Sequence, residues 1–114
     1  MQQLNQVLLR GHVGNIRVQT VAGKQMARLS VATNYAYKSR EGDPVVETTW
    51  SQVVAFEGPK MPDFSQIAKG TPVEVKGRLR SQRYTDADGV ERTAYEILAN
   101  QVTVVENTDS CGDE

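Results

Sequence analysis

Apolar and polar side chains alternate along most of this chain, and this period of two constrains the fold more than any other feature. The clearest example is the segment 71–80, in which Val73 and Val75 alternate with Glu74 and Lys76. Successive side chains of a strand lie on opposite faces of a sheet, whereas the apolar side of a helix repeats every three to four residues. Helical spacing is scarce here, so the sequence predicts an all-β protein.

Five strands are predicted, each bounded by residues that favour turns. Their ranges are 4–20, 25–34, 45–56, 71–80 and 92–105. Gly11 and Gly14 interrupt the first range and predict a bulge or a sharp bend there. The turn at 86–89 is expected to close a long hairpin between the last two strands.

One short helix is predicted between the third and fourth strands. Pro62 suits the first position of a helix, and residues 63–69 are long enough for two turns ended by Gly70. The resulting order of strands and helix is that of the five-stranded Greek-key barrel known as the OB-fold. A small β-sandwich has similar strand spacing and is the alternative fold.

The charge is unevenly distributed along a chain of one domain's length. Residues 1–105 are expected to form the domain, and residues 106–114 a short, acidic, disordered tail. The net charge is −1, but the tail holds four acids and no base, so the domain carries ten acids and thirteen bases. A domain charge of +3 permits a polyanionic partner without identifying one.

Several classes of protein are excluded by composition. Apolar runs are too short for a membrane-spanning helix, and the first residues lack the charged and apolar regions of a secretory signal. The single cysteine, Cys111, excludes an internal disulfide and indicates a reducing compartment. With His12 as the one histidine, a zinc site is not expected. We therefore expect a cytoplasmic protein without metal, cofactor or membrane contact.

The outward parity of the fourth strand carries three bases and leads toward an aromatic side chain. Its members are Glu74, Lys76, Arg78, Arg80, Gln82 and Tyr84, opposite a core-facing set of Thr71, Val73, Val75, Gly77 and Leu79. Cations suit the phosphates of a polynucleotide, and a flat aromatic ring suits its bases. The alternative is an ordinary solvated strand face.

The third strand repeats this pattern. Trp50 and Phe56 share one parity and lie roughly 20 Å apart along a strand, a spacing that suits separate stacking points. A lone tryptophan flanked by small residues is also typical of a core anchor, and both interpretations stay open. Tyr35 and Tyr37 are expected at the start of the loop that follows the second predicted strand, directly before Lys38 and Arg40. Two tyrosines that lead into a basic loop indicate a contact surface.

Other candidate sites are weaker. Asp86, Asp88 and Glu91 resemble the start of a calcium loop, but the later ligand positions are missing, and a turn explains these residues better. His12 has no serine or cysteine motif that would form a nucleophilic triad. No pair of acid and base residues has a spacing typical of catalysis, so an enzyme is not expected.

Five segments together resemble the bacterial single-stranded DNA-binding protein family: 5–14, 29–34, 49–56, 69–80 and 84–89. They occur in the family's order and span nearly all of 4–105. The resemblance implies an OB-fold that binds and protects single-stranded DNA during replication, recombination and repair. It further implies that Tyr37, Trp50, Phe56 and Tyr84 stack on bases, and that phosphates contact Arg10, Arg17, Arg40, Lys69, Arg78, Arg80 and Arg83, to which the strand pattern adds Lys76.

The resemblance also bears on partners. It implies a homo-oligomer, a tetramer or a dimer, acting on DNA in the bacterial cytoplasm. Family members typically continue through a long linker to an acidic tip ending in Pro-Phe that recruits replication and repair proteins. The sequence ends at Glu114 without that tip. It is either a truncated form or a variant whose tail does not recruit the usual partners, and recruitment of those proteins is left open.

Two other functions remain as alternatives. A primosomal accessory protein is a dimeric relative of the same fold that binds DNA and replication proteins, and oligomeric state distinguishes it. A small barrel scaffold without a nucleic-acid role would bury its aromatic side chains. The sequence does not distinguish DNA from RNA, because stacking does not depend on the sugar.

Overall fold

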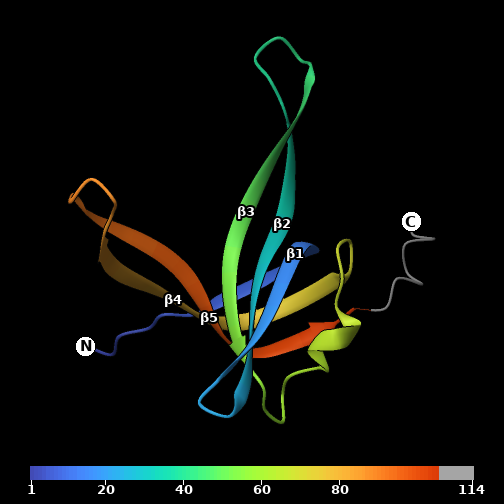
Figure 1. Cartoon of the computed structure of the whole chain (residues 1–114). Helices are drawn as coiled ribbons and strands as arrows, with labels where there is room; N and C mark the ends of the chain where they lie inside the picture. The colour runs from blue at the N-terminus through green and yellow to red at the C-terminus, as the bar shows by residue number, and fades with distance from the viewer. Residues whose placement is uncertain (106–114) are drawn as a thin grey trace.

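Five strands close into a barrel in the computed structural model, which describes residues 1–105 (Figure 1). The strands are β1 (Val7–Val21), β2 (Lys24–Lys38), β3 (Pro44–Phe56), β4 (Pro72–Thr85) and β5 (Glu91–Val104). Their order around the barrel is β1-β2-β3-β5-β4, and every pair except β3 with β5 is antiparallel. This architecture confirms the predicted five-stranded OB-fold and excludes the sandwich.

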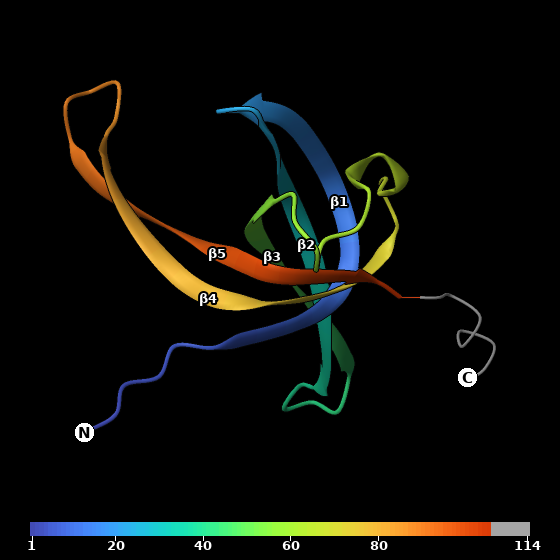
Figure 2. The same ribbon diagram turned by 90° about the horizontal axis from the view of Figure 1, so that it is seen from below.

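Two long hairpins, β2–β3 and β4–β5, project from the barrel in different directions (Figures 1 and 2). The prediction that the second strand ends at Asn34 is wrong, because β2 continues to Lys38. Tyr35 pairs with Glu47 and Tyr37 with Val45, so both tyrosines lie on a strand and not in a loop. The fourth strand is also longer than predicted, and it ends at the hairpin turn.

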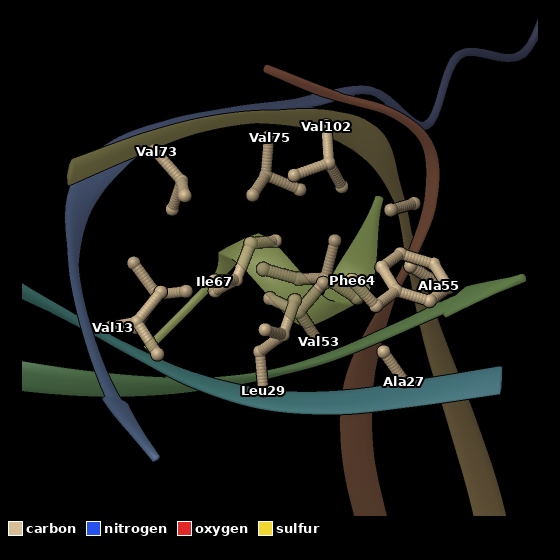
Figure 3. Close-up of a cluster of buried hydrophobic side chains, with 13 residues drawn as sticks. Val13, Ala27, Leu29, Val53, Ala55, Phe64, Ile67, Val73, Val75 and Val102 are labelled. Atoms are coloured by element: carbon tan, nitrogen blue, oxygen red, sulfur yellow. The ribbon is translucent and has the colours of Figure 1, made fainter. Parts of the chain in front are cut away.

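The core fills the barrel with side chains from all five strands and from the connection between β3 and β4. Its buried members are Val13, Ala27, Leu29, Val31, Val53, Ala55, Phe64, Ile67, Val73, Val75, Ile97, Ala99 and Val102. Phe64 and Ile67 point into the space between β2 and β3 on one side and the valines of β4 and β5 on the other (Figure 3). The alternation read from the sequence therefore describes the inner face of the barrel.

Within β4 the predicted core-facing parity holds only as far as the barrel extends. Val73, Val75 and Gly77 are buried, but Leu79 is 45% exposed, and its prediction as a core residue is wrong. The β4–β5 hairpin extends away from the barrel (Figure 2), so the inward parity of β4 no longer faces the core along the hairpin. Thr71 lies just before the strand and is half-buried.

The predicted two-turn helix over 63–69 is wrong in length and in its starting residue. The connection contains one turn of 3-10 helix, η1 (Phe64–Gln66). Asp63 and not Pro62 begins it, because the Asp63 carboxylate accepts hydrogen bonds from the Ser65 backbone N–H at 3.0 Å and the Ser65 hydroxyl at 2.8 Å. A 3-10 helix has three residues per turn, so Phe64 and Ile67, which lie three residues apart, both face the core.

The first strand begins at Val7, later than predicted. Upstream of it, the Asn5 side-chain amide donates to the Leu79 carbonyl at 2.7 Å and its oxygen accepts from the Leu79 N–H at 3.0 Å, so a side chain replaces a strand partner there. The register of β1 against β2 shifts at Gly14, which confirms the predicted bulge, whereas Gly11 is paired regularly with β4. No helix in residues 1–105 is long and apolar enough to cross a membrane.

Candidate nucleic-acid interface

All four aromatic side chains predicted to stack on bases are exposed. The exposed fraction is 57% for Trp50, 48% for Tyr84, 45% for Tyr37 and 40% for Phe56. The exposure of Trp50 excludes the alternative that this residue anchors the core. A flat ring held at the surface by a strand can stack on a base without disturbing the barrel.

The four rings are divided between two surfaces. Trp50 and Phe56 lie on the outer face of β3, because the alternate residues of that strand are in the core. Tyr84 lies on the outer face of β4 by the same alternation. Tyr37 belongs to the opposite face of the β2–β3 hairpin, where its ring stacks on that of Tyr35 with centroids 6.0 Å apart and an interplanar angle of 29°.

Two adjoining surface hollows gather three of the predicted contact residues. One is lined by Trp50 and Lys69 and the other by Arg17, and both share Asn15 and Gln52 as lining residues. These five side chains come from β1, β3 and the connection that follows η1. The fold thus places one cation, Lys69, in the hollow of the exposed indole and a second, Arg17, in the adjoining hollow, an arrangement that suits a base and its phosphates.

An ion-paired bridge crosses the outer face between the aromatic side chains of β3 and β4. The Glu96 carboxylate accepts hydrogen bonds from Nε of Arg80 at 3.0 Å and from Nη2 of the same residue, and it lies 3.6 Å from Nη1 of Arg28. The Glu96 side chain is only 11% exposed. Val54, which has the outward parity of β3, is 2% exposed although it is not a member of the cluster inside the barrel.

The sequence analysis missed Glu96 and Arg28. Arg80 pairs with Glu96 because the connection between β4 and β5 spans 86–90. Counting outward from the predicted turn at 86–89 instead pairs Arg80 with Tyr95, so the predicted hairpin did not indicate this contact. The contact of Glu96 with Arg28 depends on the parallel pairing of β3 with β5. No local feature of the sequence indicates that pairing.

Two other predicted phosphate contacts are also ion-paired. Arg10 donates to Glu74 at 2.5 Å, and Arg83 donates to Glu91 at 3.2 Å. Hydrogen bonding from Arg10 holds the pKa of the Glu74 carboxyl below its usual value. Exposed pairs of this kind contribute little stability, and the arginines remain accessible to a phosphate that competes for them.

Five predicted cations have no ion pair within the described part of the chain: Arg17, Arg40, Lys69, Lys76 and Arg78. Arg40 lies in the turn of the β2–β3 hairpin, far along the ribbon from the barrel. Lys76 lines a separate hollow together with Leu8. The structure therefore brings Lys69 to the hollow of the indole, Arg17 to the adjoining hollow and Arg78 to the outer face of β4 that carries Tyr84, but does not gather all the predicted cations at one place.

The acidic residues at the tip of the β4–β5 hairpin form a turn. The Asp86 carboxylate accepts from the backbone N–H groups of Asp88 at 2.9 Å and Val90 at 3.0 Å, and from Nε of Arg92 at 2.5 Å. These hydrogen bonds, that of Arg92 foremost, lower the pKa of Asp86. No group of three or more side chains suited to a metal ion occurs in residues 1–105.

The chain is similar to known proteins over nearly all of the barrel. Residues 4–105 match the single-strand binding protein family. The chain is 37% identical over 106 residues to a single-stranded DNA-binding protein of Xanthomonas campestris pv. campestris, a match covering 90% of this chain and 60% of that protein. It is 31% identical over 114 residues to single-stranded DNA-binding protein 1 of Chlorobaculum tepidum, covering 96% and 69%.

A solved structure shows the same fold. The Plasmodium falciparum SSB in complex with ssDNA superimposes with a TM-score of 0.73 at 23% identity, covering 92% of this chain and 96% of that chain. The chain spans about three fifths of the length of the Xanthomonas relative. The family match covers all five strands of the barrel, and the chain belongs to the single-strand binding protein family.

Proposed function

We propose that this chain binds single-stranded DNA without sequence selection as its main activity, and that it is not an enzyme. The observation that carries the proposal is the exposure of Trp50 and Phe56 on one outer face, with Lys69 in the hollow of the indole and Arg17 in the adjoining hollow. Base stacking on aromatic rings contributes about 1–3 kcal/mol per base and accepts every base. Membership of the family supports the same function.

The proposed path of the strand follows the outer face from β3 to β4. It passes the indole of Trp50, crosses the bridge made by Glu96, and reaches Tyr84 on the long hairpin. The proposed contacts are those expected from the sequence: Tyr37, Trp50, Phe56, Tyr84, Arg10, Arg17, Arg40, Lys69, Lys76, Arg78, Arg80 and Arg83. Of these, Tyr37 and Arg83 lie on the reverse faces of their hairpins, so the strand has to wrap around a hairpin to meet them.

We propose further that the protein acts as a homo-oligomer. Residues 7–11 pair with β4 along one edge, and no strand within residues 1–105 pairs with their other edge. Leu8, in the same segment, is 65% exposed. An unpaired strand edge with an apolar side chain favours association with a second chain. A tetramer supports the DNA-protecting role, whereas a dimer favours the primosomal alternative, and sedimentation equilibrium distinguishes the two.

The names of the bacterial relatives support a proposal on the biological setting. Two of them carry the name single-stranded DNA-binding protein, and strands without a partner arise whenever chromosomal DNA is copied, recombined or repaired. We place the activity of this chain in those processes, in the cytoplasm.

Trp50, the one tryptophan of the chain, supplies the test. Titration with oligo(dT) should quench its fluorescence to saturation, and rising salt should reverse the effect because counterions compete for phosphates. A duplex of equal length should compete poorly. Absence of quenching, or equal competition by duplex, would refute the proposal, and the response to oligo(U) distinguishes DNA from RNA.

A further inference from the structure

Two arginines on neighbouring strands lie directly opposite each other on the outer face of the barrel. Arg17 of β1 pairs with Arg28 of β2 in the antiparallel register, and both side chains are exposed. Side chains at directly opposed positions have Cβ atoms about 4.5–5.5 Å apart, and like charges placed there destabilise the sheet. The stability of the sheet therefore does not account for a second cation at this place.

The same two arginines line one surface hollow. Its other lining residues are Asn15, Ile16 and Gln52, so no acid is among them. The side-chain amides of Asn15 and Gln52 can donate hydrogen bonds, as can both guanidinium groups. Apart from Ile16, the hollow is thus lined by hydrogen-bond donors and positive charge, the combination that an anion requires.

The neighbouring carboxylate does not neutralise this pair. Arg17 has no ion pair within residues 1–105, and Arg28 lies 3.6 Å from Glu96. Glu96 is shared with Arg80, from which it accepts two hydrogen bonds. Three guanidinium groups and one carboxylate leave a charge of +2, and the side chain of Arg28 remains 54% exposed.

We propose that the hollow between Arg17 and Arg28 is a phosphate site in which both guanidinium groups hold one phosphate. A guanidinium group donates parallel hydrogen bonds to phosphate oxygens, and a phosphate between two such groups replaces their repulsion by attraction. Where the phosphate belongs to a bound strand, the inference rests on the proposed function. It then adds a contact, Arg28, to which neither the strand pattern nor the family resemblance assigns a role.

The site also takes free inorganic phosphate, because it is formed by the folded sheet without DNA. Binding to the folded state alone raises stability, so free phosphate should stabilise the protein through this hollow. It should also compete there with the phosphates of a strand.

The first test uses inorganic phosphate without DNA and compares melting temperatures in phosphate and in chloride of equal ionic strength. Arg17→Gln should melt about 1–5 °C higher than the parent in dilute chloride, because the like-charge pair is removed and no ion pair is lost. Phosphate should raise the melting temperature of the parent more than that of Arg17→Gln or Arg28→Gln. Its general stabilising effect on folded proteins is common to all variants. Lys24→Gln, which removes an exposed cation outside the hollow, should respond as the parent does.

The second test measures the salt dependence of oligo(dT) binding by Trp50 fluorescence. One phosphate contact on a single strand contributes about 0.7 to the slope of log affinity against log salt. If both arginines hold the same phosphate, the double variant Arg17→Gln/Arg28→Gln should lose about 0.7 of this slope, and Lys24→Gln should lose none. A loss of about 1.4 would show that each arginine holds its own phosphate, which overturns the shared site.

The outcomes separate this inference from the proposed function. If both arginine variants match Lys24→Gln in the two tests while oligo(dT) still quenches Trp50, the phosphate site is refuted and DNA binding stands. If oligo(dT) does not quench the parent, the proposed function is refuted, and the melting temperatures alone decide on the site. Loss of the phosphate response in both arginine variants supports the site, and a shallower salt slope assigns it to the strand as well.

Discussion

Substituting Glu96 by glutamine should strengthen DNA binding and weaken the fold at the same time. The Glu96 carboxylate neutralises one of the two guanidinium groups that it bridges, Arg80 and Arg28. Glutamine keeps the shape but raises the charge of this group of three side chains from +1 to +2. A phosphate approaching the outer face then no longer competes with a carboxylate for Arg80, which the parent protein holds through two nitrogens.

The size of both effects follows from the geometry. Each additional phosphate contact on a single strand steepens the slope of log affinity against log salt by about 0.7. Relative to the affinity at 1 M salt, this raises the affinity at 0.2 M salt by about threefold. With two arginines released, the slope of Glu96→Gln should steepen by about 0.7–1.4. The Glu96 side chain is 11% exposed and that of Arg80 31%, so the lost charge-assisted hydrogen bonds should cost about 1–2 kcal/mol of unfolding free energy.

Two measurements on the same preparation check this prediction: salt-dependent titration with oligo(dT), followed by Trp50 fluorescence, and urea unfolding. Glu91→Gln is the matched control, because its ion pair with Arg83 is exposed on both sides, at 62% and 74%. It should leave the stability nearly unchanged. Weaker binding by Glu96→Gln with an unchanged salt slope would show that the carboxylate positions the arginines and does not mask them, and the reasoning would fail.

Three further substitutions test the site and the fold. Trp50→Ala should lower the affinity for a single strand by about 1–3 kcal/mol in a binding assay by filter or anisotropy, with the melting temperature unchanged because the side chain is exposed. A fall in melting temperature would return this residue to a structural role. Leu29→Ala should cost about 2–5 kcal/mol of unfolding free energy in urea, since Leu29 is 1% exposed, and a smaller loss would contradict the described core. The hydrogen bond from Arg92 lowers the pKa of Asp86 from 3.8. The ionised Asp86 therefore contributes its full stabilisation of the folded state above that pH, and this stabilisation is lost as the pH falls through the lower pKa of the folded state. Acid unfolding of Asp86→Asn should accordingly depend less on pH below about 4, and an unchanged pH profile would show that this hydrogen bond does not stabilise the folded state.

The sequence predicted the barrel because burial inside it follows a local rule. Val73 and Val75 face the core for the same reason that Lys76 does not, namely the alternation of a strand. The rule gives no information on where a strand leaves the barrel. Leu79 has the parity of a core residue and is exposed, since its surroundings depend on how far the neighbouring strands extend.

The helix between β3 and β4 shows a second limit of local patterns. Pro62 and the length of 63–69 favour a helix of two turns, but the connection has to bring Phe64 and Ile67 into the end of the barrel. Side chains three residues apart share a side of a 3-10 turn, and a single such turn buries both. Packing against strands distant in the sequence outweighed the local preference.

Residue types predict the candidate site only in part, because they do not show which arginines are ion-paired. A domain charge of +3 states how many bases exceed the acids, but it does not state which bases lie next to an acid. Glu96, Glu74 and Glu91 form ion pairs with Arg80, Arg10 and Arg83. These pairs depend on the register between neighbouring strands, which the sequence does not state.

The pairing of these charges changes how the interface is expected to work. Lys69 shares a hollow with Trp50, and Arg17 lines the adjoining hollow. No carboxylate pairs with either cation within residues 1–105, so a phosphate meets them without competition. On the long hairpin, Arg80 has to exchange a carboxylate partner for a phosphate, which contributes less free energy than binding a free cation. The side of β3 should therefore hold a strand more tightly than the hairpin does, and contact with Tyr84 should be the first to be lost as salt rises.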